Sequence, residues 1–504
     1  MNLIAEPWIP VIGRDGAHRL VSLEELFLQA ASIRDLAVKP HERIALWRLL
    51  ICIAQAALDG PEDQSAWETC REEIPDRGQT YLRKWKAQFE LFGDGARFLQ
   101  VPNLKPGKDD GEGNDATKLD ITLATGHNAT VFDNAGGSER ARTPAQLALT
   151  LLTFQCFSPC GIIGAVQWAE RLIPKCTGRH APCAASCMLH TYICGGTIAD
   201  TLHANLLDKA TVADHYGAEG WGKPVWEMMV SKPADEEAIR NTTNTYLGRL
   251  VPLSRLVRLD EQGFSIMLGN GLTYPTSSVF REAAATVEAR DKEPGLLSAS
   301  LERSVWRQIS AITVKRQADK SRLGGPLALT NDLPAGGCRI WVGALVTAGN
   351  GKIEDVVEAA YDLPADMFQD TGRQIYEAGV AHAEAWASAL GRSVKACAGV
   401  LKLQPPPYEK ARQHFWTAIE QHVPVLLELT NTPALAADFS ATPWGQAVRA
   451  TAERAYEFVC SRQTPRQIEA FAKGRQQLFP RNASSRPGGQ TQAKPVKTKA
   501  IRKS

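Results

Sequence analysis

Six cysteines fall within 39 residues of the sequence and are the side chains best suited to chemistry. They are Cys156, Cys160, Cys176, Cys183, Cys187 and Cys194, with His180 among them. Thiolates are good zinc ligands, and the three-residue gap between Cys183 and Cys187 could place two of them on one helical turn. However, the C-x-x-C pairs of most structural zinc sites are missing, and Cys156 lies in an apolar run where a free cysteine behaves as a small hydrophobic residue. We therefore predict no metal and no cofactor, with a metal-binding cysteine site as the alternative.

A glycine-rich turn offers a second kind of chemistry. It consists of Thr347, Ala348, Gly349, Asn350, Gly351 and Lys352. Backbone N–H groups approach phosphates or base edges closely where no Cβ intervenes, and Asn350 or Lys352 would add a directional or charged contact. An ordinary type I′ hairpin turn would use the same residues. A nucleic-acid contact and a plain turn are both compatible with these residues.

The signatures of common enzymes are absent from the sequence. It contains no G-x-x-x-x-G-K-[ST], G-x-G-x-x-G, H-E-x-x-H, G-x-S-x-G or C-x-x-C pattern. In the glycine-rich turn, Lys352 is followed by Ile353, which cannot ligate Mg²⁺. The ten histidines are scattered, so nothing points to a catalytic triad. We predict that the chain is not an enzyme and has no catalytic residues.

The charge balance hides an uneven distribution. Fifty-seven Lys and Arg against 55 Asp and Glu give a formal charge of +2. The segment 481–504 has no acidic residue, and its basic residues are Arg481, Arg486, Lys494, Lys497, Lys499, Arg502 and Lys503. The rest of the chain therefore carries about −5 by formal count. We expect a disordered basic tail that binds nucleic acid non-specifically through Lys494, Lys497, Lys499, Arg502 and Lys503, with a solvated extension as the alternative.

The overall composition is that of a globular protein, with 44% hydrophobic and 22% charged residues. No apolar run reaches the roughly 18 residues of a membrane span, and the N-terminus lacks the basic region and apolar core of a signal peptide. Eleven cysteines form no regular framework, which fits a reducing compartment. We expect a soluble, cytoplasmic protein without membrane contact.

Capping and hydrophobic patterns predict a mixed α/β region up to residue 363. Helix starts are expected at Ser22, with Glu25 completing a capping box, and at Thr143, with Gln146 in the same role. The other expected elements are a strand at 8–12, a buried helix at 41–58, a mobile loop at 103–118, a buried helix at 147–157, strands and hairpins between 221 and 279, and a strand at 340–346 that ends in the glycine-rich turn.

Beyond residue 363 the pattern becomes helical. Four stretches are predicted, at 368–393, 408–429, 443–462 and 464–479, with a bend at Pro424 in the second. Short connections between them favour a four-helix bundle. The expected fold is therefore α+β, with a mixed α/β domain at 1–363, a C-terminal four-helix bundle at 364–480 and the basic tail at 481–504.

The sequence resembles the CasA family, the large subunits of the type I-E CRISPR surveillance complex Cascade, in three segments. Residues 2–11 (NLIAEPWIPV) are similar to the family's N-terminus, and residues 126–134 (GHNATVFDN) to the loop that follows its mobile segment. Residues 196–207 (GTIADTLHANLL) resemble a G-x-x-L-x-x-T-L-x-x-N-L helix, with Ala199 in place of the first leucine. The order of a large mixed domain and a helix bundle also agrees, and the similarity spans about residues 1–480.

The resemblance implies a non-catalytic subunit that reads DNA. Such a subunit checks the protospacer-adjacent motif in duplex DNA, mainly from the minor groove, and helps to open the duplex, after which guide-RNA pairing reads the sequence. The implied partners are the guide RNA, double-stranded target DNA, the backbone, handle-binding and small subunits of Cascade, and a helicase-nuclease that the bound complex recruits. The helix bundle would dock against the small subunits.

The resemblance also implies roles for particular residues. Those that match the loop touching the 5′ handle of the guide are Val131, Phe132 and Asp133, where an apolar or aromatic side chain can stack on a flipped base. Those near the family's glycine loop, along the motif's minor groove, are Ala184, Ala185 and Ser186. Those that match the wedge hairpin below the motif are Thr347, Gly349, Asn350, Gly351 and Lys352, with Gly349 or Asn350 at the tip.

Four features of the family have no counterpart here. The small-residue segment has no glycine, the wedge has no glutamine, no lysine stands near Phe264 or Ser265 where the minor-groove lysine would map, and no zinc-type cysteine group surrounds residues 259–264. Because minor-groove readout is degenerate, these differences leave the DNA motif undetermined. Two other classes of protein stay open: a cysteine-rich metal-binding enzyme or factor, and a stand-alone helical adaptor protein.

Overall fold

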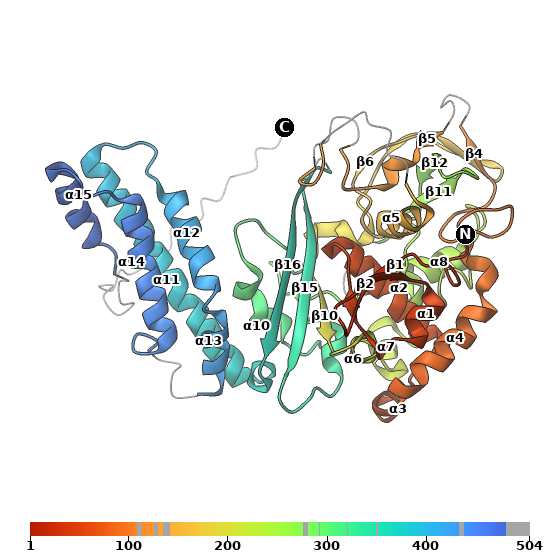
Figure 1. Ribbon diagram of the computed structural model, residues 1–504, viewed down its shortest axis with the longest axis horizontal. Coiled ribbons are helices and arrows are strands. Elements are labelled where there is room, and N and C mark those ends of the chain that lie inside the picture. Colours follow the sequence, from red (N-terminus) through yellow and green to blue (C-terminus); the bar gives the residue numbers. More distant parts are fainter. Residues whose placement is uncertain are drawn as a thin grey trace, which may run out of the picture. The chain divides into compact units, whose positions relative to one another are not determined.

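The computed structural model describes residues 1–107, 113–124, 130–134, 142–275, 281–291, 293–319, 321–348, 351–432 and 438–479. The chain forms two compact units, Met1–Gln374 and Ile375–Ser504 (Figure 1). The first mixes helices with several small sheets, and the second is helical where it is described. The predicted α+β fold class is therefore confirmed. Among the helices in these ranges, none is long and apolar enough to cross a membrane.

A three-stranded antiparallel sheet opens the first unit. Its strand order is β2 (His18–Val21), β1 (Ile9–Gly13) and β3 (Ile33–Leu36). Helix α1 (Leu23–Leu28) follows β2, and the Ser22 hydroxyl caps it by accepting a hydrogen bond from the Glu25 backbone N–H at 3.1 Å. The predicted helix start is present, because the cap satisfies an N–H group that has no partner inside the helix. The expected capping box is incomplete, because the Glu25 carboxylate accepts from the Gln29 side-chain amide at 3.3 Å instead of from the Ser22 N–H.

Two apolar helices, α2 (Pro40–Leu58) and α5 (Pro144–Phe157), lie in the core of the first unit, as predicted. The expected capping box begins α5, because Thr143 Oγ1 accepts from the Gln146 backbone N–H at 3.2 Å while Gln146 Oε1 accepts from the Thr143 N–H at 3.0 Å. Helix α2 packs against α4 (Ile74–Lys84) and α5. Burial on nearly all sides explains why neither helix has a clear polar face.

The expected loop at 103–118 is partly wrong. Strand β4 (Leu104–Pro106) pairs with β7 (Val166–Trp168), and β5 (Asn114–Asp115) pairs with β12 (Ser265–Asn270). Residues 108–112 lie outside the described part. Both strands are short and polar, and their partner strands are far away in the sequence. The local composition therefore did not indicate β4 and β5.

The region 221–279 is also only partly as predicted. The expected hairpin exists, with β11 (Arg255–Leu259) antiparallel to β12. Two helices precede it, however: α8 (Glu236–Asn244) and α9 (Tyr246–Leu250). Within α8, the Thr242 and Thr243 hydroxyls donate to the carbonyls four residues earlier at 2.9 and 2.7 Å, which satisfies these side chains inside the helix.

The longest strands of the first unit form the hairpin predicted around the glycine-rich turn. Strand β15 (Cys338–Thr347) lies between β16 (Ile353–Leu363) and β10 (His190–Cys194), and both pairings are antiparallel (Figure 1). The middle of β15 is buried throughout, as its continuous apolar sequence predicts, whereas β16 forms one edge of the sheet. The hairpin therefore rests on the core at β15 and carries the turn at its end.

Short elements complete the described part of the first unit. They are α3 (Gln64–Thr69), β6 (Gly161–Ile163), β8 (Arg171–Ile173), β9 (Cys176–Gly178), α6 (Ile198–Ala204), α7 (Lys209–Tyr216), β13 (Val287–Glu288), β14 (Gly295–Leu296) and α10 (Ile309–Ile312). Strands β6 and β9 pair with each other across the cysteine-rich segment.

The second unit is built from helices. They are α11 (Asp370–Leu401), which starts in the first unit, α12 (Tyr408–Glu420), α13 (Val423–Glu428), α14 (Pro443–Val459) and α15 (Pro465–Arg475). Pro424 lies in the first turn of α13, so the predicted bend is a complete break between α12 and α13. The predicted capping box at Thr464 and Gln467 begins α15. The basic tail lies outside the described residues.

Candidate nucleic-acid interface

The segment that contains Ala184, Ala185 and Ser186 has an unusual backbone; we call these three residues the small-residue loop. It belongs to a short 3₁₀ turn, Pro182–Cys187, which is interrupted at Ala185 and Ser186. Ser186 and Cys187 have φ values of +56° and +50°, in the left-handed region that favours glycine. Each such residue costs on the order of 1–2 kcal/mol. The loop therefore keeps a glycine-type conformation without a glycine.

A sulfur contact joins this loop to the glycine-rich turn. The Thr347 backbone N–H donates to Cys187 Sγ at 3.3 Å, and the Cys187 thiol lies 3.5 Å from the Thr347 carbonyl oxygen. The two residues are 160 positions apart in the sequence, yet they sit at the end of β15 and at the end of the loop. Two segments that were predicted separately to contact DNA are thus adjacent, although only Ala185 and Ser186 of the loop reach the surface, because Ala184 is buried.

The glycine-rich turn also packs against the cysteine-rich segment. The Gly351 N–H donates to the Ala348 carbonyl at 2.9 Å, and the Ala348 N–H donates to the Lys352 carbonyl at 2.8 Å. Gly351 has φ of +82°, and a Cβ at this position would lie 2.4 Å from the Cys160 carbonyl oxygen. Glycine is therefore required here by both conformation and space. Gly349 and Asn350 lie outside the described residues.

The six cysteines of this segment differ in burial. Cys156 of α5 and Cys183 are fully buried beside Arg48, whereas Cys160, Cys176, Cys187 and Cys194 are half-buried. Burial alone would raise the pKa of the Cys183 thiol, but the hydrogen bond with Cys156 and the charge of Arg48 lower this pKa below the usual thiol value. Within the described ranges, no three His, Cys, Asp or Glu side chains converge in a way that could hold a metal ion.

An exposed aromatic side chain marks the segment predicted to touch the guide handle. Phe132 is 36% exposed and Val131 is 49% exposed, while the Asp133 N–H donates to the Thr122 carbonyl at 3.2 Å and holds the backbone. The Phe132 ring centroid lies 5.3 Å from that of His41, and Lys39 Nζ lies 5.8 Å from it. An exposed ring beside a cation suits the stacking of a base whose phosphate meets the lysine.

Sequence reasoning did not identify Lys39 and His41 as part of this patch. Both residues lie at the start of α2, where Lys39 is the N-cap and His41 follows Pro40. A lysine and a histidine near a helix N-terminus are too common in protein sequences to indicate a binding site. Burial, and then the charge of Lys39, lower the pKa of His41 to about 3, so its imidazole is neutral near pH 7. His41 therefore supports the Phe132 ring without adding charge.

A buried ion cluster stabilises the region behind the interface. Glu282 Oε2 lies 3.1 Å from Arg48 Nη1, and its other oxygen pairs with Arg249; all three side chains are at most 5% exposed. Burial alone would raise the pKa of Glu282, but the charges of Arg249 and Arg48 lower it to about 2. The cluster links α2, α9 and the segment 281–291.

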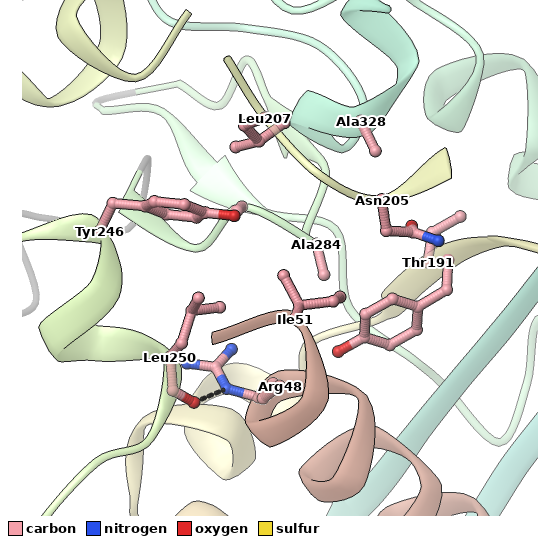
Figure 2. A pocket seen from close by; sticks show the side chains of 11 residues that line it. Arg48, Ile51, Thr191, Asn205, Leu207, Tyr246, Leu250, Ala284 and Ala328 are labelled. Carbon is pink, nitrogen blue, oxygen red and sulfur yellow. Dashed lines mark hydrogen bonds between the residues drawn. The ribbon is translucent and has the colours of Figure 1, made fainter. Parts of the chain in front are cut away.

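A small internal cavity lies next to Arg48 (Figure 2). Its volume is about 20 Å³, enough for one water molecule. Figure 2 shows Arg48 on α2 donating to the Leu250 carbonyl, with Tyr246 on a neighbouring wall. The distance from Arg48 Nε to that carbonyl oxygen is 2.8 Å. The cavity is therefore a packing space within the core and is too small for a ligand.

Comparison with known proteins gives a consistent result. The model of the family described as CRISPR-associated protein Cse1 matches residues 2–455. The CRISPR-associated protein CasA/Cse1 of Thermus thermophilus is 29% identical over 412 residues, which are 78% of this chain and 76% of that protein.

Solved structures share the fold at lower identity. CasA (Cse1) of Thermus thermophilus has a TM-score of 0.71 at 22% identity, covering 95% of this chain and 99% of the other. Cse1 of Acidimicrobium ferrooxidans has a TM-score of 0.70 at 20% identity, covering 95% and 96%. A chain of a CRISPR RNA-guided surveillance complex has a TM-score of 0.72 at 17% identity, covering 95% and 99%. Because the family model matches most of the sequence, the chain belongs to the CRISPR-associated protein Cse1 family.

Proposed function

We propose that this chain is the large, non-catalytic subunit of a Cascade-type CRISPR surveillance complex, and that it recognises a short motif in duplex DNA and helps to open the duplex beside it. The observation that carries this proposal is the contact between Cys187 and Thr347, which unites the small-residue loop and the glycine-rich turn. The membership of the Cse1 family supports it, as does the fold shared with a chain of an RNA-guided surveillance complex.

The two parts of this surface would act differently on DNA. At Ala185 and Ser186, which reach the surface, the small-residue loop has no bulky side chain, so its backbone there would approach the floor of the minor groove, where few groups distinguish base pairs. The glycine-rich turn stands at the end of the hairpin of β15 and β16 and would enter the duplex as a wedge. A few such contacts suffice, because guide pairing reads the rest of the sequence.

The other partners would bind elsewhere on the chain. Phe132 would stack on a base of the guide-RNA handle, with Lys39 near its phosphate. The helices of the second unit would dock the small subunits, and the DNA-bound complex would recruit a helicase-nuclease. The body carries about −5 by formal count, so neighbouring subunits would supply most of the charge that holds the DNA backbone.

A binding experiment tests the wedge directly. The assembled complex is prepared with wild-type chain, with the double variant Asn350→Ala/Lys352→Ala, and with Lys232→Ala, a control at an exposed lysine on the segment before α8. We expect the double variant to assemble normally but to bind motif-bearing duplex at least about tenfold more weakly, as expected for the loss of one or two base or phosphate contacts. Unchanged affinity of the double variant would refute the wedge assignment.

A further inference from the structure

A cavity of about 520 Å³, which we call the basic pocket, lies beside the small-residue loop. Its lining includes Arg179 and His180 after β9, Ala185 and Ser186 of the loop, Arg255 at the start of β11, and Asn270 at the end of β12. This volume is within the range of roughly 300–1,000 Å³ typical of small-molecule sites. Ala185 and Ser186 therefore belong both to the proposed DNA surface and to the lining of the basic pocket.

The pocket carries an excess of positive charge. Three of the described lining residues are arginines, Arg179, Arg249 and Arg255, and the one acidic residue among them is Glu282. Glu282 is already engaged, because both of its oxygens bind Arg48 and Arg249. Within the described part of the chain, neither Arg179 nor Arg255 forms an ion pair with a carboxylate. An anionic ligand would supply the missing counter-charge.

Arg255 is the most informative of these cations, because it is 3% exposed. Its guanidinium donates to three backbone carbonyls, those of Ser254 at 2.9 Å, Pro159 at 3.1 Å and Arg179, and its Nε has no partner among the described residues. Carbonyls satisfy hydrogen bonds but do not neutralise a charge. Burial lowers the pKa of Arg255 to about 10, so the cation persists at neutral pH without a counter-ion.

His180 adds a neutral donor to the same wall. Its Nδ1 accepts a hydrogen bond from the Cys160 backbone N–H at 3.3 Å. Burial, and then the charge of Arg255, lower the pKa of His180, so the ring is neutral near pH 7. A neutral ring that accepts at Nδ1 carries its proton on Nε2. Arg179 and His180 are therefore the side chains that can donate to a phosphate group, while Arg255 contributes positive charge rather than a further hydrogen bond.

The rest of the lining is apolar or weakly polar. Pro182, Leu272, Pro275 and Leu296 supply apolar walls, and the Tyr274 ring lies beside them. Apolar walls and an aromatic ring accept the faces of a base, while the side-chain amide of Asn270 can pair with a base edge. A ligand that matches both sides of the pocket has a phosphate group and an apolar, planar part, as a nucleotide does.

We infer that the basic pocket binds a single unpaired nucleotide, with the base between the apolar walls and the phosphate at Arg179 in the field of Arg255. This inference rests on the proposed function, because the wedge at the glycine-rich turn would release such a nucleotide from the duplex. The route is short: Ser186 lines the pocket, and the next residue, Cys187, contacts Thr347 at the base of the turn. Capturing an unpaired nucleotide would oppose re-annealing of the opened duplex.

The first experiment measures binding of a deoxynucleoside 5′-monophosphate to the full chain by titration calorimetry. Two variants change the pocket: Arg179→Ala removes an exposed cation, and Thr273→Trp adds a bulky side chain at an exposed position of the lining. Arg171→Ala, on β8 outside the pocket lining, is the matched control. We expect each pocket variant to weaken binding at least about tenfold, as for the loss of one charge-assisted contact, and the control to leave it unchanged. Absence of wild-type binding, or equal binding by inorganic phosphate, would overturn the inference.

The second experiment separates a nucleotide within DNA from a free one. A motif-bearing duplex with two unpaired positions beside the motif carries either normal bases or abasic residues at those positions. We expect the wild-type complex to prefer the base-bearing duplex, and the Thr273→Trp complex to lose this preference. Equal affinity of the wild-type complex for both duplexes would overturn capture from DNA while leaving motif recognition intact. If the full chain binds the monophosphate but the assembled complex shows no preference for the DNA motif, the proposed function is refuted while nucleotide binding by the basic pocket is supported.

Discussion

The buried Glu282 should make the first unit sensitive to acid in a measurable way. Its pKa of about 2 in the folded chain lies well below the ordinary glutamate value of 4.5. A group with a lowered folded pKa contributes stability that is fully present above its unfolded pKa and is lost as the pH falls through the folded pKa. The difference of about 2.5 units corresponds to roughly 3 kcal/mol of unfolding free energy above pH 5, of which about 2 kcal/mol is lost by pH 3.

The variant Glu282→Gln isolates this contribution. At pH 7 it leaves Arg48 and Arg249 buried without their counter-charge, and we expect it to lower the free energy of unfolding by about 3–5 kcal/mol. Because glutamine does not titrate, the gap between wild type and variant should narrow by about 2 kcal/mol between pH 6 and pH 3. Other carboxylates titrate in both proteins and cancel in the difference.

Urea unfolding, followed by tryptophan emission at several pH values, measures this gap. The control is Glu302→Gln, which changes an exposed carboxylate and should give a difference near zero at every pH. A gap between wild type and Glu282→Gln that is the same at pH 6 and pH 3 would refute the assignment of a strongly lowered pKa to Glu282.

Three further predictions concern the nucleic-acid contacts. Cys187→Ala should release the Thr347 N–H and weaken motif-dependent duplex binding about three- to tenfold, whereas Cys187→Ser, measured in the same assay, should restore part of it. Phe132→Ala should weaken binding of guide-handle RNA about tenfold in a filter-binding assay, as for the loss of one stacked base, while Phe458→Ala, at an exposed ring of α14, should not. Deleting residues 481–504 should lower the salt dependence of non-specific DNA binding without changing the preference for the motif; an unchanged salt slope would contradict a role for the tail.

The local features of the fold were predictable from the sequence because they depend on neighbouring residues. The capping boxes at Thr143 and Thr464 begin α5 and α15, since each satisfies N–H groups within one turn. Pro424 separates α12 from α13 for the same kind of local reason. The apolar strand within β15 was also visible, because a fully buried strand has a continuous hydrophobic sequence.

Most of the errors and omissions involve contacts between distant residues; the unexpected helices α8 and α9 are an exception. Strands β4 and β5 exist because β7 and β12 offer them backbone partners, and nothing in their own composition shows it. Cys187 and Thr347 are 160 positions apart in the sequence. Each of the two segments could therefore be predicted as a DNA contact, but their contact with each other could not. Nothing in the sequence around Arg255 distinguishes it from other arginines in strands. It became a candidate ligand-binding residue only because the structure buries its side chain without an ion pair to a carboxylate among the described residues.

The central claim is that this chain gives the complex its motif preference. The most direct measurement selects tightly bound duplexes from a library that is randomised beside a target matching the guide, using the complex assembled with and without the chain. We predict that the complete complex enriches one short motif and binds it at least about tenfold more tightly than scrambled sequences, since each mismatch in a recognised site costs about 1–3 kcal/mol. The same enrichment by the complex that lacks this chain would contradict the claim.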